Sequence, residues 1–309
     1  MCYLRRLSAH CLKYRPLLSA PTLRSRQVAS IHNLSTDETP SLVTIEKREE
    51  VTLIGINRPT KRNCVNRETA GQLLRAFNDF ETDKTSPVAV LHGNGGTFCA
   101  GYDLKELSET NASLLDQFLV RGPMGPTQML TTKPIIGAID GYAVAGGLEL
   151  ALLCDLRVVE ENAIMGFFNR RFGVPLIDGA TVRLQRLIGL SRALDLILTG
   201  RGLSAKEALE FGLANRVVAV GTALGQAYNL AKSLVKFPQE CLKADRHSTY
   251  FSAFDGKSME ESLKYEFENG KPIISKESIE GANKFAEKGI GKHGKFVLHN
   301  FSYDVKVTV

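Results

Sequence analysis

The chain has 309 residues, of which 43% are hydrophobic and 23% are charged, and its formal net charge is +6. These values are ordinary for a globular protein with one large domain or two small ones. No stretch approaches the roughly 18 consecutive apolar residues that would predict a transmembrane helix.

The positive charge is concentrated at the N-terminus. Residues 1–36 contain Arg and Lys but no Asp or Glu, and outside them 33 basic residues balance 33 acidic ones. A neutral remainder removes the electrostatic case for nucleic acid or an anionic membrane as the main partner. The acid-free segment contains Arg and Ser with interspersed Leu, which is typical of an organellar transit peptide, and it lacks the unbroken apolar core of a secretory signal. We therefore predict that residues 1–36 direct the chain to the mitochondrial matrix, with a disordered tail as the alternative.

The cysteines and histidines are dispersed along the chain. No two cysteines form a CxxC pair and no two histidines have HxxxH spacing. The pattern therefore predicts neither a disulfide framework nor a metal site.

Up to residue 222 the chain alternates between strand and helix patterns. Residues 41–59 alternate around a polar centre at 47–50, which predicts a β-hairpin. Further elements are expected in this order: an amphipathic helix at 67–83, a buried strand at 87–92, a mostly helical segment at 114–130, and buried strands at 133–139 and 156–159. Strands that alternate with helices indicate an α/β fold.

From residue 223 onward helical patterns dominate. The expected helices are 223–236, 238–250, 258–268 and 275–287. We therefore expect an α/β core over residues 41–222 and a helical C-terminal region over residues 223–290. Residues 291–309 remain unassigned.

A single carboxylate stands out in the middle of the chain. Glu149 is the only charged residue from Gly141 through Cys154. An ionised carboxylate is costly to bury, so it either shifts its pKa or receives hydrogen bonds, and both outcomes are common at catalytic sites. Gly146 and Gly147 precede it at an expected helix start, where a ligand can approach the backbone closely.

A second segment repeats this arrangement. Residues 93–107 read GNGGTFCAGYDLKEL, which predicts a strand end, small residues and then a helix that begins near Asp103. Two backbone N–H groups on separate turns can converge on one oxygen, as in an oxyanion hole. The alternative is that these glycines serve only to make tight turns.

The two segments FCAGYDLKEL and GYAVAGGLELALLCD together resemble the enoyl-CoA hydratase/isomerase (crotonase) superfamily. The motifs INRPTKRNCVN, FGVPLIDGATVRLQRLIG and LTGRGLSAKEALEFGLANRVV reinforce the resemblance, which spans residues 42–290. It implies a crotonase-like spiral of ββα units with a helical C-terminal trimerisation region, in a homotrimer or a dimer of trimers. It also implies an acyl-CoA substrate, with coenzyme A as part of that substrate and no permanently bound cofactor.

The resemblance also assigns site residues. The backbone N–H groups of Tyr102 and Gly146 are expected to form the oxyanion hole. Contacts to coenzyme A are expected from Arg62, Asn63, Cys64, Val65, Ala100, Tyr102, Asp103, Leu104, Lys105 and Gly146. Lys105 is either a phosphate contact or a solvated helix lysine. Phe285, Lys288 and Lys292 are expected to reach a neighbouring subunit's coenzyme A.

The acid–base residues depart from the family pattern. Glu149 matches a catalytic glutamate that hydratases of the family use to activate water, and Asn169 stands where they carry the second one. An amide can form hydrogen bonds but cannot exchange a catalytic proton at neutral pH. Asp178, nine residues further on, is either a replacement proton donor or a loop cap before Gly179.

The functional hypothesis is hydration of a 2-enoyl-CoA, or the reverse dehydration, with Glu149 as base. Alternatives are a double-bond isomerase, a decarboxylase or a thioester hydrolase acting on a CoA thioester. A further alternative is a non-catalytic protein that binds CoA or RNA. The neutral charge of the chain outside residues 1–36 argues against RNA as the ligand.

Overall fold

The structure is a computed structural model and describes residues 41–110 and 122–288. The predicted transit segment 1–36 and the tail 291–309 lie outside the described residues. The described residues all belong to one compact unit.

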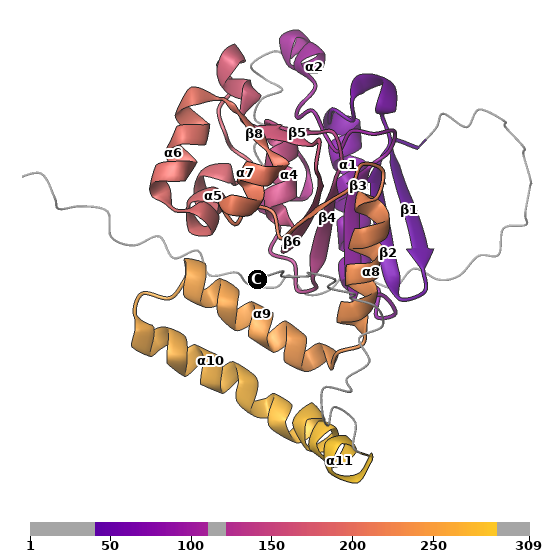
Figure 1. The fold of residues 1–309 in the computed structure, drawn as a ribbon, viewed down its shortest axis with the longest axis vertical. Coiled ribbons are helices and arrows are strands. Elements are labelled where there is room, and N and C mark those ends of the chain that lie inside the picture. The colour runs from indigo at the N-terminus through magenta and orange to yellow at the C-terminus, as the bar shows by residue number, and fades with distance from the viewer. Residues whose placement is uncertain (1–40, 111–121, 289–309) are drawn as a thin grey trace, which may run out of the picture. The chain divides into compact units, whose positions relative to one another are not determined.

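Two β-sheets organise the described residues (Figure 1). The larger sheet has the strand order β1-β2-β3-β4-β6-β9, and the smaller has the order β5-β7-β8. The strands of the larger sheet are β1 (Val43–Arg48), β2 (Val51–Ile56), β3 (Val88–Gly93), β4 (Ile135–Ile139), β6 (Leu156–Glu160) and β9 (Arg216–Val218). Those of the smaller sheet are β5 (Tyr142–Val144), β7 (Ile164–Gly166) and β8 (Gly202–Ser204).

Helices connect and cover these strands. The α-helices are α1 (Arg67–Thr82), α2 (Leu104–Glu109), α4 (Gly146–Leu153), α5 (Ala180–Ile188), α6 (Leu190–Thr199), α7 (Ala205–Glu210), α8 (Ala223–Val235), α9 (Gln239–Phe254), α10 (Met259–Ile273) and α11 (Ile279–Lys288). Short 3-10 turns are η1 (Pro59–Lys61), η2 (Pro126–Gln128) and η3 (Phe168–Phe172), and η4 (Ile274–Ser278) is a π-helical turn.

The strand pairing confirms most of the sequence-based elements. β1 and β2 form the expected antiparallel hairpin, in which Val43 lies opposite Ile56. The other neighbours in the larger sheet are parallel, so each pair needs a crossover connection rather than a tight turn. The sequence patterns did not reveal β5, β7, β8 and β9, because three residues are too few to show a period.

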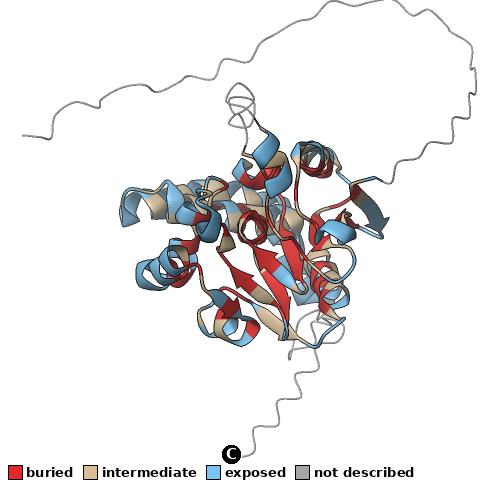
Figure 2. Cartoon of the chain, turned by 90° about the horizontal axis from the view of Figure 1, so that it is seen from above, coloured by how far each residue is buried: buried red, intermediate tan, exposed pale blue. Residues whose placement is uncertain are grey.

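Both faces of the larger sheet are covered, which explains the almost continuous apolar sequence of its central strands. In β2, Ile54 and Ile56 belong to the buried cluster that includes Leu73 and Phe77 of α1. The alternate residues of the same strand, Val51 and Leu53, pack on the other face with Ala227 and Leu230 of α8. In Figure 2 the central strands are accordingly buried in the middle of the cartoon, with exposed helix faces around them.

Helix α8 belongs to the packed core. It packs across the four central strands of the larger sheet, β2, β3, β4 and β6. The sequence pattern changes at residue 223, as expected, but the helix that follows packs in the same core as the strands before it.

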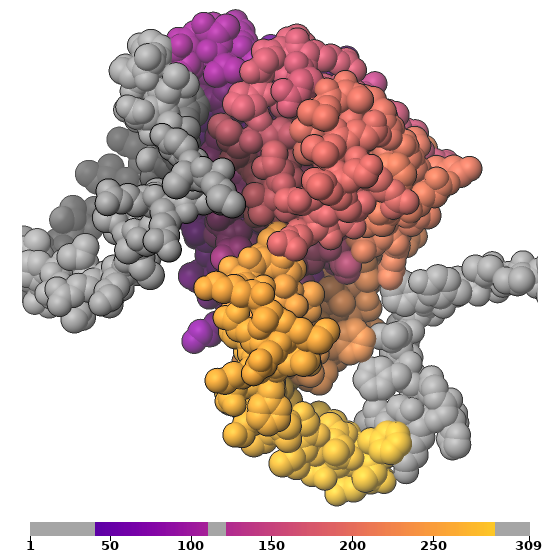
Figure 3. Space-filling view, turned by 90° about the vertical axis from the view of Figure 1, so that its left-hand side faces the viewer, coloured from indigo at the N-terminus to yellow at the C-terminus, as the bar shows by residue number. Residues whose placement is uncertain are grey.

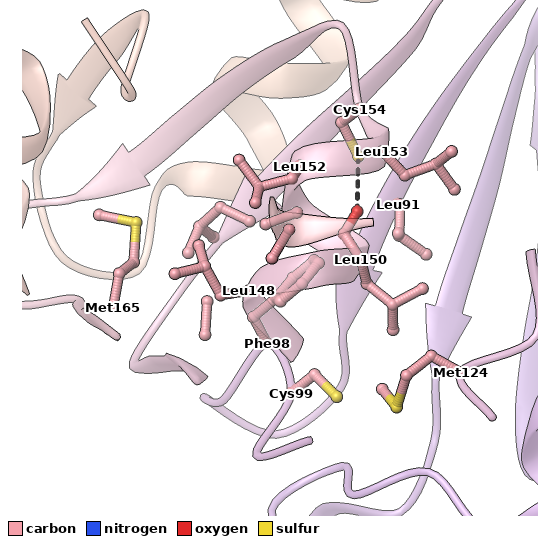
Figure 4. Close-up of a cluster of buried hydrophobic side chains, with 14 of the residues drawn as sticks. Leu91, Phe98, Cys99, Met124, Leu148, Leu150, Leu152, Leu153, Cys154 and Met165 are labelled. Atoms are coloured by element: carbon pink, nitrogen blue, oxygen red, sulfur yellow. Dashed lines mark hydrogen bonds between the residues drawn. The ribbon is translucent and has the colours of Figure 1, made fainter. Parts of the chain in front are cut away.

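Helix α4 is surrounded by core on all sides. Its eight residues are all buried, including Glu149. Figure 4 shows Leu148, Leu150, Leu152 and Leu153 pointing in different directions from the helix, with Cys99 and Met124 near its first turn. A helix that is apolar all round is the expected form for a fully buried segment.

The C-terminal helices are held to the core through Asp155. Its carboxylate accepts hydrogen bonds from the Ile135 N–H (2.8 Å), from Arg246 Nε (2.9 Å) and from the Tyr250 hydroxyl (2.9 Å). Arg246 also donates to both oxygens of Thr131. Helix α10 packs against α9, and in Figure 3 α10 and α11 lie apart from the α/β core.

Two helix predictions need correction. The expectation of helix at 114–130 is wrong for Gly122–Leu130, where only the short turn η2 occurs, and residues 114–121 lie outside the described residues. Gly122 and Gly125 have φ values of +80° and +87°, and Pro126 follows, so this sequence cannot continue a helix. The two helices expected at 258–268 and 275–287 join through η4, because Pro272 interrupts the hydrogen-bond ladder and a π turn accommodates it.

None of the helices in the described part of the chain is long and apolar enough to cross a membrane.

Candidate active site

Two turns, one after β3 and one before α4, lie against each other. Cys99 and Ala143 form a parallel β-bridge, and the Cys99 N–H donates to the Tyr142 carbonyl (2.9 Å). Glycine is required on both sides of the contact. A Cβ on Gly101 would lie 2.9 Å from the Ala145 Cβ, and a Cβ on Gly147 would lie 2.1 Å from the Cys99 carbonyl oxygen. The two glycine segments identified from the sequence are therefore brought together.

The residue before α4 has a strained backbone. Ala145 has φ 52° and ψ −127°, a conformation that residues with a Cβ seldom adopt and that is concentrated at functional sites. Gly146 follows as the first residue of the helix, and among the described residues its N–H has no hydrogen-bond acceptor. The strain at Ala145 thus accompanies a helix N-terminus whose first N–H is available to a ligand.

A cavity of about 390 Å³ opens beside these turns. Of the residues predicted for the site, it is lined by Ala100, Tyr102, Leu104, Gly146, Glu149, Asn169 and Asp178. Most of the remaining wall is apolar and was not predicted, including Leu107, Pro123, Met124, Phe168, Phe172 and Ile177. Met124 lies in a segment expected to be helical, so the sequence offered no signal for its position in this wall.

Glu149 is held by the backbone of the loop before α5 and of the first residue of that helix. Its Oε1 accepts hydrogen bonds from the N–H groups of Asp178 (3.0 Å) and Ala180 (3.1 Å). Burial is the largest influence on its pKa, and the neighbouring carboxylate of Asp178 adds to it. Together they raise the Glu149 pKa to about 7, against the opposing effect of the two N–H donors and of Arg183. The carboxyl group can therefore take up or release a proton near neutral pH.

Asp178 ties the Gly122–Gln128 segment to the site. Its Oδ1 accepts from the Met124 N–H (3.2 Å) and from the Thr127 hydroxyl. Burial raises the Asp178 pKa, although these two bonds and Arg183 favour the charged form. Arg183 donates to the carbonyl oxygens of Asp178 (3.3 Å) and Thr127 (2.7 Å), which joins the same two loops a second time. The described hydrogen bonds of the Asp178 carboxylate thus go to the Gly122–Gln128 segment and not to the loop before Gly179, which the side chain was expected to cap. The residue also lines the cavity.

Asn169 has one satisfied and one unsatisfied polar atom. Its Nδ2 donates to the Val174 carbonyl (2.7 Å), and only the amine end of the amide can face that oxygen. Its Oδ1 is buried and has no hydrogen-bond partner among the described residues. A buried acceptor left without a donor costs about 1–3 kcal/mol.

Several residues expected to contact coenzyme A have structural partners instead. The Asn63 side chain is fully buried, donates to the Asn94 carbonyl (2.8 Å) and the Thr97 carbonyl (2.5 Å), and accepts from the Arg58 N–H (2.8 Å). Val65 is also fully buried. Neither side chain is available to a ligand.

The rest of this set lies around the start of α2. Asp103 pairs with Arg58 (3.0 Å) and caps the helix through the Lys105 N–H (3.2 Å). Cys64 is half-buried, and burial raises its pKa to about 11, so it stays a thiol at neutral pH. Arg62 and Lys105 are the exposed cations of the expected set.

Within residues 41–110 and 122–288, no three His, Cys, Asp or Glu side chains are grouped so that they could hold a metal ion.

A comparison with known proteins shows to which family the chain belongs. Residues 46–294 match the model for enoyl-CoA hydratase/isomerase. The chain is 31% identical over 241 residues to mevalonyl-coenzyme A hydratase sidH of Aspergillus fumigatus, a match that covers 77% of this chain and 89% of that protein. It is 33% identical over 252 residues to enoyl-CoA hydratase EchA19 of Mycobacterium tuberculosis, covering 79% of this chain and 93% of that one.

A solved structure gives the same result for the fold. The probable enoyl-CoA hydratase/isomerase from Mycobacterium abscessus superposes with a TM-score of 0.72 at 38% identity, over 80% of this chain and 96% of that one. The likeness confirms the α/β fold with C-terminal helices that the sequence motifs implied.

The raised pKa of Glu149 predicts a specific pH dependence of stability. The folded chain holds this proton more tightly than the unfolded chain, whose carboxyl has a pKa near 4.5. The stabilisation is complete below that value and is lost as pH rises through about 7. Glu149→Gln mimics the protonated form. We expect the unfolding free energy of the variant, relative to the original chain, to rise by about 2–3 kcal/mol between pH 5 and pH 8.

Denaturant unfolding at the two pH values measures this difference. The matched control is Glu161→Gln, at an exposed position in the turn after β6 that does not line the cavity. An equal effect of Glu149→Gln at both pH values would mean that the Glu149 pKa is not raised.

Proposed function

The chain belongs to the enoyl-CoA hydratase/isomerase family, and we propose that it adds water to a 2-enoyl-CoA thioester or removes water from the corresponding 3-hydroxyacyl-CoA. One observation carries this proposal. The carboxyl group of Glu149, whose pKa is about 7, lines the same cavity as the unoccupied N–H of Gly146.

The Gly146 N–H is proposed to bind the thioester carbonyl oxygen. Negative charge gathers on this oxygen when the thioester becomes an enolate, and a donor fixed in advance stabilises it without reorganisation. The start of α4 adds the partial positive charge of a helix N-terminus. The backbone N–H of Tyr102, in the facing turn, is proposed as the second donor.

Glu149 is proposed as the base that activates water. A base must be deprotonated, so activity is expected to rise with pH through about 7, where the Glu149 carboxyl loses its proton. Arg62 and Lys105, the exposed cations near the start of α2, are proposed contacts for the phosphates of coenzyme A.

A second candidate reaction is double-bond isomerisation of an enoyl-CoA. Asn169, where the family's hydratases carry a carboxylate, favours it. Moving a double bond needs only one group that takes a proton from one carbon and returns it to another, and Glu149 can do both.

The hydration proposal is tested with a short 2-enoyl-CoA by following the loss of its conjugated thioester absorbance. We expect turnover, and we expect Glu149→Gln to reduce kcat at least about 100-fold, as for removal of a general base. Glu161→Gln serves as the exposed control. If the original chain leaves the absorbance unchanged but converts a 3-enoyl-CoA into its conjugated isomer, the isomerase candidate replaces hydration.

The cavity wall predicts the charge of the acyl group. Its described lining contains two acidic side chains, Glu149 and Asp178, and no Lys, Arg or His. An acyl group that ends in a carboxylate would lose its bound water on entering the cavity and would find no cation in this described lining to pair with. We expect kcat/KM for such a 2-enoyl-CoA to be at least about tenfold below that for its methyl ester, a difference of about 1.4 kcal/mol. Equal values for acid and ester would contradict the prediction.

An oligomer built through the C-terminal helices is also proposed. Large apolar side chains are exposed along α10, η4 and α11, namely Met259, Leu263, Phe267, Ile274, Ile279 and Phe285. An apolar surface of this kind marks a contact region. The side chain of Lys288 and the whole of Lys292, expected to reach a neighbouring site, lie outside the described residues. Sedimentation is expected to give the mass of a trimer or hexamer, and a monomer at micromolar concentration would contradict this.

A further inference from the structure

Asn169, a residue of the cavity wall, carries a buried hydrogen-bond acceptor that has no partner among the described residues. The Asn169 side chain is 7% exposed and lines the cavity, and its Nδ2 is fixed on the Val174 carbonyl. Its Oδ1 is therefore held in one orientation, buried and without a donor among the described residues. An oxygen in this state is suited to accept a hydrogen bond from a bound ligand or water.

Few groups in this cavity can exchange a proton. The titratable side chains in its described lining are Tyr102, Glu149 and Asp178. The Tyr102 hydroxyl donates to Glu106 (2.7 Å), and burial together with that carboxylate raises the phenol pKa far above neutrality. Burial raises the Asp178 pKa as well, but its Oδ1 accepts from the Met124 N–H and the Thr127 hydroxyl, which favour the charged form and hold the side chain to the Gly122–Gln128 segment. The Glu149 carboxyl, with a pKa of about 7, can both take and return a proton near neutral pH.

We propose that Asn169 is a positioning residue whose Oδ1 accepts a hydrogen bond from the oxygen that attacks or leaves C3 of the acyl group, while Glu149 performs both proton transfers. The inference rests on the hydratase function proposed above. It assigns to an amide the task of orienting the oxygen and to one carboxylate the whole of the acid–base chemistry.

The atoms balance in each direction. In hydration, the water oxygen forms a bond to C3 as the Glu149 carboxylate takes one of the water protons, and the C2–C3 double-bond electrons move to the thioester oxygen as an enolate. The enolate then re-forms the carbonyl while C2 takes the proton from Glu149, which returns to its carboxylate form. In dehydration, Glu149 removes the C2 proton and gives it to the departing hydroxyl as the C3–O bond breaks.

The pH dependence of the reaction distinguishes one proton carrier from two. The charged groups that face Glu149 are Asp178, in the loop before α5, and Arg183 of α5. With one carboxylate, hydration needs only the deprotonated form of Glu149, so kcat/KM is expected to rise with pH and then stay level. A second group that acts as an acid would have to remain protonated, and the rate would fall again at high pH.

Two substitutions at Asn169 test the assignment. Asn169→Leu keeps the size of the side chain but removes the acceptor. We expect kcat for hydration to fall at least tenfold and KM to change less than twofold. We also expect kcat/KM still to rise with pH and then stay level. Asn169→Glu adds a second carboxyl group, and we expect its profile to become bell-shaped. Asn162→Leu, at an exposed turn position, is the matched control, and thermal unfolding checks that each variant is folded.

The outcomes separate this inference from the function on which it rests. If the original chain hydrates 2-enoyl-CoA and Asn169→Leu leaves kcat unchanged, the positioning role is wrong and the hydratase function stands. If the original chain already gives a bell-shaped profile that Asp178→Asn converts to a single limb, Asp178 is the acid and the single-carrier chemistry is wrong. If the original chain does not hydrate any 2-enoyl-CoA, both proposals fail together.

Discussion

The contact between the Glu149 carboxylate and the backbone N–H groups of Asp178 and Ala180 is the interaction on which the site depends. A carboxylate in a wholly buried helix is too costly to tolerate unless donors are supplied to it. The donors come from the loop before α5 and from the first residue of α5, so burying Glu149 also fixes that loop. The Asp178 side chain then fixes the Gly122–Gln128 segment through Met124 and Thr127.

Backbone geometry completes the arrangement on the other side of the cavity. Gly101 and Gly147 allow the turns after β3 and before α4 to approach within distances that a Cβ would prevent. Ala145 adopts a strained conformation at this point, and the Gly146 N–H beside it is left without an acceptor in the described part of the chain. Met124 packs so closely on Gly146 that a Cβ there would lie 2.6 Å from its sulfur. The segment held by Asp178 thus also packs on the turn that carries the proposed oxyanion donor.

Membership of the family and the identity of the reaction rest on different residues. The glycine turns and the buried Glu149 lie within residues 46–294, which match the enoyl-CoA hydratase/isomerase family model. Asn169 stands where the sequence resemblance leads us to expect a second catalytic glutamate. Because an amide cannot carry a proton at neutral pH, the chemistry turns on whether Glu149 acts alone or together with Asp178.

The sequence by itself determined the elements whose cause is local. The β1–β2 hairpin, α1, and the start of α4 at Gly146 follow from residue periodicity and from glycine placement, which act over a few neighbouring positions. It also singled out Glu149, because one charge in an apolar run is visible without a structure. Only the tertiary structure decided the partners. The Met124–Asp178 and Asn63–Thr97 bonds join residues 54 and 34 positions apart, and Glu149 receives its two backbone donors from residues 29 and 31 positions away. Such pairings arise from packing between distant segments, and a local pattern contains no record of them.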